Sequence, residues 1–364
     1  MNDDLVAFAE QATLGALLLH PDTIGQVSGW LRASDFATNW HTHVYAALLD
    51  RHAAGDRINA ETIAADVGQR TGTLAGDGLR VIDLLTTAPV RPQPVAYARM
   101  VAEAGLRREV CAQGILLRAG ALQTVLSDDP QPLTSACLMV DAGLDTVGRR
   151  WADTHGRPRP SSTAPIPLRG RPLSLELRTG ADKYLSAFPG RDPVVERVHQ
   201  VELIAALIAH PDALPDVAAW LTPTAIHDPG WRAVYGAACH LAERGASIDV
   251  LTVAWTAAVL EPCGVPVPSI NELRDAVDLG WHDHPRRAAR LVAGEHVRAL
   301  ADTAADQLTS RSADPATSVD DLIESAHSFT TALRRAAIAV ADPSAGSRTR
   351  SGQPVGAAHG PVAR

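Results

Sequence analysis

Lysine is almost absent from this 364-residue chain, and that scarcity excludes one class of enzyme. A P-loop needs glycine-rich backbone amides around the phosphates of a nucleotide and a lysine that reaches the terminal ones, in the pattern GxxxxGK[ST]. Lys183 is the only lysine, and it follows Ala181 and Asp182 and precedes Tyr184. No P-loop can be drawn within these 364 residues, so we expect no ATPase activity and no cofactor.

Cysteines are few and far apart. The four cysteines form no CxxC pair; they are Cys111, Cys137, Cys239 and Cys263. This spacing argues against a zinc knuckle and against a disulfide framework. We therefore expect buried, reduced thiols and no metal site.

Long apolar runs and a basic leader are also missing. The chain starts with MNDDLVAFAE, which is acidic where a signal peptide is basic, and no uninterrupted apolar run reaches the roughly 18 residues that span a bilayer. These features predict a cytoplasmic protein with no membrane contact. The formal net charge of −8 works against nonspecific attraction to a polyanion and favours protein partners, although a local basic patch is still able to bind nucleic acid.

What the chain does contain is an internal repeat. LLLHPDTIGQVSGWL returns later as LIAHPDALPDVAAWL, and the pairs His20 and His210, Trp30 and Trp220, and Tyr45 and Tyr235 are each 190 residues apart. That period is far longer than the roughly 20 to 50 residues of solenoid repeats, so each copy is large enough to be a domain with its own core. The sequence predicts a tandem duplication.

Both copies are predicted to be all-α, because neither shows a period-2 strand pattern. Apolar residues recur at helical spacing near the start of each copy. These stripes consist of Leu5, Phe8, Ala12, Ala16 and Leu19 in the first copy and of Val194, Val198, Val201, Ala205 and Ile208 in the second. The repeated His-Pro-Asp is interpreted as a break between the first two helices, because proline and aspartate suit a first helical turn.

Later signals extend the helical pattern. A third helix is expected to begin at Asn39 in the first copy and at Asp228-Pro229 in the second, and to end in a left-handed cap at Gly55 and Gly245. Asn59 and Asp249 are expected to cap the fourth helix, and Ser318 and Asp321 are spaced as a capping box. Each copy should end in a hairpin of two long helices, over about 95–126 and 133–150 and over about 286–308 and 319–335. We predict a first domain at 1–150, a linker at 151–192, a second domain at 193–341 and a disordered tail at 342–364.

The linker is rich in proline and arginine and is predicted to be semi-extended, with partial order around 173–177. Its cations are the candidate nucleic-acid contacts: Arg157, Arg159, Arg169, Arg171, Arg178 and Lys183. Stacking aromatics are sparse there, since only Tyr184 and Phe188 lie close by. The alternative is a plain solvated linker.

One set of residues in the first copy follows the pattern of a known family. The set consists of EQATLGALL from Glu10, Leu31, Asp35-Phe36, His41, Val44-Tyr45, Gly55, Ile58, Thr62, Tyr97-Ala98, Val101, Glu103 and Arg107-Arg108. With these residues the first copy resembles the N-terminal domain of the bacterial replicative DNA helicase, the DnaB family. The second copy is a diverged version, with Ala225-Ile226 in place of Asp35-Phe36, Trp231 in place of His41 and Ala288-Ala289 in place of Tyr97-Ala98.

The resemblance implies a small helical globule followed by a helical hairpin. In the family this domain forms the collar of a hexameric ring, pairs through its hairpins and docks primase, whereas a separate RecA-type domain is the motor. The candidate partner interface comprises Tyr97, Arg99, Glu103, Arg107 and Arg108. The alternative for Arg107 and Arg108 is that they are simply exposed helix positions.

Other chemistry has a structural explanation. His41-Thr42-His43 and His282-Asp283-His284 have the residue types of metal ligands, and Asp128-Asp129 and Asp320-Asp321 those of acid and base pairs. All lie at predicted helix starts, where acidic side chains are stabilised by the dipole. We predict a non-catalytic interaction protein of DNA replication that binds primase or the replicative helicase, with self-association or an internal pseudo-dimer. A nucleic-acid-binding accessory protein is the alternative.

Overall fold

The described part of the chain is built from helices. The computed structural model describes residues 3–72, 77–160, 175–260, 266–279 and 284–340. Within these ranges every regular element is an α-helix or a short 3-10 helix, and the prediction of an all-α fold is confirmed. The tail at 342–364, Cys263, His282 and Asp283, and Arg169 and Arg171 lie outside the described residues.

The helices follow the same order in the two copies. The α-helices of the first copy are α1 (Asp3–Leu19), α2 (Ile24–Val27), α3 (Asn39–Ala54), α4 (Ala60–Thr71), α5 (Asp77–Thr87), α6 (Pro94–Ser127) and α7 (Gln131–Thr154). Those of the second copy are α9 (Pro193–Ala209), α10 (Leu214–Ala218), α11 (Pro229–Glu243), α12 (Val250–Leu260), α13 (Ile270–Leu279), α14 (Pro285–Ala313) and α15 (Val319–Val340). Between them, α8 (Leu175–Ser186) is a helix inside the predicted semi-extended linker, and this corrects the linker prediction.

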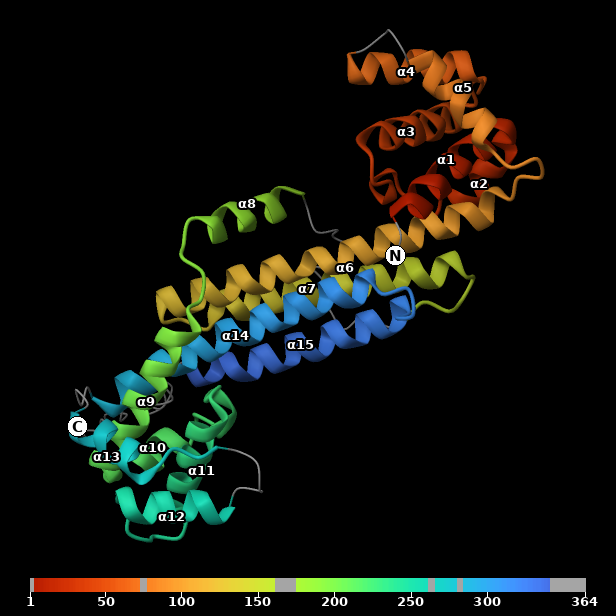
Figure 1. Ribbon diagram of the computed structural model, residues 1–364. Helices are drawn as coiled ribbons and strands as arrows, with labels where there is room; N and C mark the ends of the chain where they lie inside the picture. The colour runs from red at the N-terminus through yellow and green to blue at the C-terminus, as the bar shows by residue number, and fades with distance from the viewer. Residues whose placement is uncertain (1–2, 73–76, 161–174, 261–265, 280–283, 341–364) are drawn as a thin grey trace, which may run out of the picture. The chain divides into compact units, whose positions relative to one another are not determined.

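The described residues fall into two compact units, and each unit takes residues from both copies. The first unit comprises Met1–Ala119, Ser135–Ala187 and Ala301–Thr331, and the second comprises Gly120–Thr134, Phe188–Leu300 and Ala332–Arg364. In Figure 1 the first unit contains α1 to α5 gathered into a globule, with α6 and α7 beside parts of α14 and α15. The second unit contains the globule of α9 to α13.

The predicted caps are confirmed. Gly55 and Gly245 have φ angles of 72° and 61°, the left-handed conformation that glycine adopts at low cost. Asn59 accepts from the Thr62 amide, and Asp249 accepts from the amides of residues 251 and 252. The amide of Asp321 donates to the Ser318 hydroxyl, as a capping box requires.

Each globule has a buried tyrosine that forms a hydrogen bond to a backbone carbonyl. The Tyr45 hydroxyl donates to the Leu31 carbonyl at 3.4 Å, and the Tyr235 hydroxyl donates to the Leu221 carbonyl at 2.8 Å. Both rings are fully buried, so the hydroxyl needs an internal acceptor. Burial also raises the pKa of both phenols above the usual range. The equal spacing from acceptor to tyrosine in each copy follows from the duplication.

The amphipathic stripes were only half right. Ala12, Ala16, Ala205 and Ile208 are buried, as expected. Toward the helix starts the stripe residues face solvent: Leu5, Phe8, Val194 and Val198 are all at least half exposed, and so is nearly half of Leu19 at the end of α1. A helical period near the starts of α1 and α9 therefore does not imply core packing.

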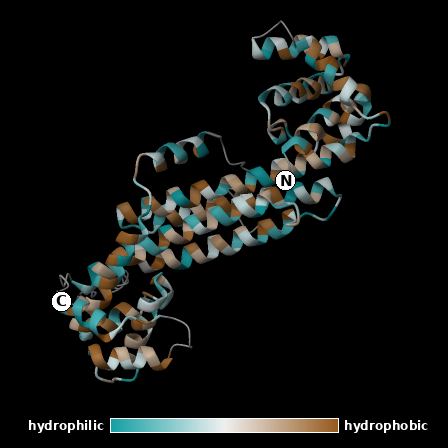
Figure 2. Ribbon diagram, viewed as in Figure 1, coloured by the Kyte–Doolittle hydropathy of each residue, from teal (hydrophilic) through white to brown (hydrophobic). Residues whose placement is uncertain are grey.

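Helix α6 bears on the expectation that no apolar segment is long enough to span a bilayer. It is the helix, among the described residues, that is long and apolar enough by length and composition to cross a membrane. Charged residues interrupt its apolar stretches, so the sequence contains no continuous apolar run of that length, and hydrophobic and hydrophilic residues alternate along α6 (Figure 2). Half of the most apolar part of the helix is buried inside the protein. A helix that packs against neighbours on several sides has the same composition, so the composition alone is weak grounds for a membrane span.

The three cysteines in the described part of the chain take part in no disulfide there. Cys137 is buried, whereas Cys111 and Cys239 are half-buried, so the expectation of buried thiols holds for one of the three. Burial raises the pKa of the Cys239 thiol, which keeps it protonated and unreactive at neutral pH.

Candidate interaction site: the paired hairpins

The candidate residue Arg107 is buried and joins the two copies within the first unit. Its side chain is 4% exposed and forms an ion pair with Glu103 at 2.9 Å. Its two terminal nitrogens donate to the carbonyls of Asp314 and Thr317, at 3.1 and 2.6 Å. These carbonyls lie at the end of α14 and in the turn to α15, where backbone acceptors lack helical partners and a cation is favoured. Arg107 is therefore not an exposed helix position.

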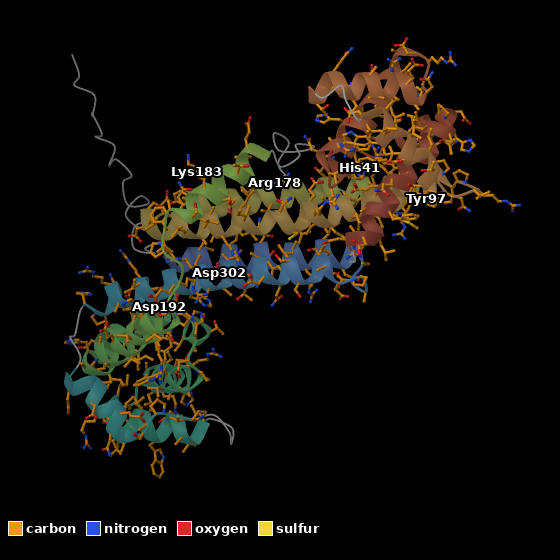
Figure 3. All side chains as sticks on the ribbon, turned by 45° about the horizontal axis from the view of Figure 1, so that its top comes forward. His41, Tyr97, Arg178, Lys183, Asp192 and Asp302 are labelled. Carbon is orange, nitrogen blue, oxygen red and sulfur yellow. The ribbon has the colours of Figure 1, made fainter. Side chains whose placement is uncertain are left out.

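The other candidate interface residues hold the base of the first hairpin. Arg99 donates from Nε to the Thr154 carbonyl at 2.9 Å, which ties α6 to the end of α7. Arg108 donates to the Asp35 carbonyl and so joins α6 to the globule. Tyr97, labelled in Figure 3, is half-buried on the first turn of α6. The set lies together on one helix, but its arginines are engaged within the chain.

Helices α6 and α14 pair along their length in the first unit. Arg118 contacts Asp302 through Nε at 3.1 Å and Asp306 through Nη2 at 2.6 Å; Asp302 is labelled in Figure 3. A Cβ atom placed on Gly114 would lie 2.8 Å from the Cβ of Ala305, closer than real Cβ atoms come. A small residue at each position thus permits the close approach of the two helices.

Helices α7 and α15 pair through a buried carboxylate. Asp141 accepts from the Thr330 hydroxyl at 2.7 Å and contacts His327 Nδ1 at 3.0 Å. Trp151 Nε1 donates to Asp320 at 3.3 Å. The hairpin of the first copy therefore packs on the hairpin of the second copy on both of its helices, and the buried Asp141 carboxylate has partners on α15.

The second unit contains the same pairing near the tip of the first hairpin. A Cβ atom on Gly294 would lie 3.2 Å from the methyl groups of Val125, and Arg290 contacts Asp128 at 3.5 Å. Asp128, at the hairpin turn, has a φ of 51°. Aspartate tolerates that left-handed conformation better than most residues. Its place in the turn accounts for Asp128 without any acid or base role.

A buried ion network fastens the first globule to its hairpin. Arg150 of α7 donates to Asp35 and, at 3.1 Å, to Glu109 of α6, and its Nη2 also reaches the Trp30 carbonyl at 3.3 Å. Burial raises the pKa of both carboxyl groups, and the Arg150 guanidinium opposes that rise. Asp35 belongs to the residues that carry the family resemblance, whereas no local pattern distinguishes Arg150, the last residue of the predicted first domain.

A second buried group explains His41. Glu10 is fully buried and accepts from the Ala37 amide at 2.7 Å, while its other oxygen contacts His41 Nδ1 at 2.7 Å. In the second copy the same place holds Gln200, whose side-chain oxygen accepts from the His227 amide at 3.0 Å. The backbone contact is retained where the acid has become an amide. His41 is thus a structural residue in this fold.

We expect Glu10→Ala to lower the free energy of unfolding by about 1–2 kcal/mol, because it leaves the Ala37 amide and the buried His41 ring without an acceptor. Glu10→Gln, which copies the second repeat, should cost less than half of that. Urea unfolding followed by far-UV circular dichroism measures both. Equal losses for the two variants would contradict the importance of the amide contact.

Two of the four described linker cations pair with acids of the chain. Arg157 pairs with Asp320 at 3.3 Å, and Arg159 binds Asp153 with two nitrogens, at 2.7 and 3.1 Å. Arg178 and Lys183 lie on α8, where Figure 3 labels them, and Lys183 is exposed. Nucleic-acid contact by this segment stays a prediction.

The candidate metal ligands form no cluster in the part of the chain that is described. No group of three or more His, Cys, Asp or Glu side chains there has an arrangement that would hold a metal ion. Asp321 belongs to the Ser318 capping box, and Asp320 contacts Trp151 and Arg157. These acids have structural partners, as expected of residues at a helix start.

Comparison with known proteins agrees with the repeated architecture. Residues 6–103 and 200–261 match the family described as DnaB-like helicase N terminal domain. The replicative DNA helicase DnaB of Mycobacterium leprae is 37% identical over 108 residues, which are 29% of this chain and 18% of that protein. The corresponding helicase of Leifsonia xyli subsp. xyli is 29% identical over 107 residues, 29% of this chain and 23% of that protein. The chain thus matches only about a fifth of the length of these relatives. It carries two segments that are similar to the DnaB-like helicase N-terminal domain.

Proposed function

We propose that this chain is a non-catalytic interaction protein of DNA replication, which binds primase or the replicative helicase through its helical hairpins. The pairing of α6 and α7 with α14 and α15 in the first unit carries the proposal. The family resemblance implies that such hairpins pair between subunits. A chain whose two hairpins pair internally supplies the equivalent of a dimer within one polypeptide, which supports an internal pseudo-dimer.

The proposal is also supported by the structural role of the polar side chains between the two hairpins. Arg107, Arg118 and Asp141 are engaged in hydrogen bonds or ion pairs between the hairpins. Such contacts hold two elements in a fixed register and offer no arrangement of nucleophile, base and oxyanion donors. We therefore expect no catalytic turnover from these residues.

Calorimetric titration tests the proposal. The purified chain is titrated with the helicase-binding domain of primase from the same cell, and then with the intact replicative helicase. We expect saturable binding to one of them, with a negative heat-capacity change, because docking buries apolar surface. Binding to primase would indicate a retained collar docking surface, and binding to the helicase alone would indicate a subunit that joins the ring. Absence of binding to both contradicts the proposal and directs attention to the linker arginines.

A further inference from the structure

The second copy contains a cavity of about 330 Å³ beside its globule, within the second unit. Its lining is Trp220, Leu221, Thr222, Thr224, Ala225, Ala293, His296, Leu300, Ala332, Arg335 and Ala336. This volume is within the roughly 300–1,000 Å³ of typical ligand pockets. The lining combines an apolar wall with a few polar groups at its edge, as such pockets usually do.

The equivalent place in the first copy is filled. The 190-residue offset pairs Ala225 with Asp35, and the pairing of Ala288-Ala289 with Tyr97-Ala98 pairs Leu300 with Glu109. In the first copy Asp35 and Glu109 hold the Arg150 side chain of α7. In the second copy both acids have become apolar, and α15 lines the same place with the small side chains of Ala332 and Ala336.

A second difference between the copies enlarges the cavity. The same alignment pairs His296 of the second copy with Gly105 of the first. A Cβ atom on Gly105 would lie 2.7 Å from the Cβ of Asp35, so in the first copy the globule presses against α6 with no room for a side chain. An imidazole at that position in the second copy requires more space between α14 and the segment that contains Ala225. The substitutions at these positions together account for the cavity.

The polar groups of the cavity define the charge of its occupant. Arg335 is exposed and is the charged residue of the lining, which contains no carboxylate. Burial and the nearby His227 lower the pKa of His296 to about 4, so its imidazole is neutral at neutral pH. A cationic side chain such as that of Arg150 would have no acidic partner in this cavity. An apolar side chain next to an acidic one would contact the apolar lining and form an ion pair with Arg335.

We propose that this cavity is the docking pocket for a partner segment that inserts one large apolar side chain and places an acidic residue against Arg335. The inference rests on the proposed function, because it names the chemistry of the segment that an interaction protein of this kind would bind. In the first copy the Arg150 side chain of α7 occupies the equivalent position. The lining of the second copy has lost both acids, so it suits an apolar side chain with an acidic neighbour better than a basic side chain.

A labelled peptide tests the pocket in the full chain. The probe is a five-residue peptide with two aspartates followed by one phenylalanine, and its binding is followed by fluorescence anisotropy. Two analogues serve as controls, one with alanine for phenylalanine and one with lysines for both aspartates. We expect each analogue to bind on the order of tenfold more weakly, since one loses the anchor and the other loses the attraction to Arg335.

Substitutions connect the binding to this cavity. Ala336→Trp fills the pocket and should weaken the acidic peptide on the order of tenfold or more, whereas Ala258→Trp, at an exposed position of α12 outside the lining, should leave it unchanged. Arg335→Glu changes an exposed residue, so the fold is retained, and it should weaken the acidic peptide and strengthen the basic analogue. Equal affinity of the three peptides, or wild-type affinity in both Ala336→Trp and Arg335→Glu, overturns the inference.

Failure of the inference is distinguishable from failure of the proposed function. If primase or helicase binds the chain and the peptide does not, the pocket assignment alone is wrong. If the peptide binds as expected and neither replication protein does, the pocket stands and the partner belongs elsewhere.

Discussion

Arg150→Met is expected to lower the free energy of unfolding by about 3–5 kcal/mol, because it leaves the buried Asp35 and the half-buried Glu109 without their shared cation. Arg150 and Asp35 have side-chain exposures of 7% and 3%, and Glu109 is 17% exposed. Removal of one member of such a network costs more than the network contributes, since the remaining carboxylates lose an ion-pair partner and do not regain full hydration. Urea unfolding measures the loss.

The loss should depend on pH in a defined direction. Burial raises the folded-state pKa of Asp35 and of Glu109, and Arg150 opposes that rise in both. A carboxyl group with a raised folded-state pKa binds more protons in the folded state, so stability falls as pH rises through the interval between its unfolded and folded pKa values. Without Arg150 that interval extends to higher pH. The difference between wild type and variant should therefore shrink as pH is lowered from about 8 to about 5.

Two controls separate this effect from general damage to α7. Arg149→Met changes the neighbouring residue, which bonds only to groups of its own helix at Asp145 and Thr146, and it should cost much less. The combination of Asp35→Ala, Glu109→Leu and Arg150→Met copies the apolar lining of the second copy and should recover much of the loss, because no buried charge remains. A triple variant as unstable as Arg150→Met alone would contradict the electrostatic explanation.

The sequence predicted the long helices and their ends because each carries a local signal. These signals act within a few residues, so they can be recognised without the tertiary structure. They are the glycines at the ends of α3 and α11, the Asn59 cap and the Ser318 capping box. Helix α5 was not predicted from the sequence. It is short, and its Asp77 accepts from Trp40 Nε1, a contact that no local pattern contains. Helix α13 was also missed, although Ser269 and Glu272 form a capping box that would have revealed it.

The candidate site was less predictable, since it depends on which helices meet. The sequence identified Arg107 as a contact residue of α6 but gave no indication that its acceptors are carbonyls near Asp314 and Thr317. It also missed Asp141, which looks like an ordinary helix acid until Thr330 and His327 are placed beside it. Contacts about 190 residues apart are set by the duplication and by helix packing, and neither leaves a signature around the individual residue.

Gly114→Leu is expected to lower the free energy of unfolding by about 2–3 kcal/mol, because α6 and α14 meet at this glycine. A Cβ atom alone would already lie 2.8 Å from the Cβ and 2.9 Å from the Cα of Ala305. Backbone and Cβ atoms cannot rotate away, so the two helices must move apart. Even Gly114→Ala should be destabilising, although alanine is favoured over glycine in a helix by about 1 kcal/mol. The midpoint and slope of urea unfolding measure both variants.

Gly236→Ala is the matched control, since Gly236 lies inside α11 with no atom within 4 Å of a Cβ placed there. It should stabilise the chain by about 0.5–1 kcal/mol, so the same substitution has opposite signs at the two glycines. Light scattering after size-exclusion chromatography extends the test to the pseudo-dimer. Wild type should be a monomer, whereas Gly114→Leu, with its hairpins forced apart, should self-associate through the released faces. An obligate wild-type dimer, with Gly114→Leu as stable as Gly236→Ala, would mean that the two hairpins do not pair within one chain.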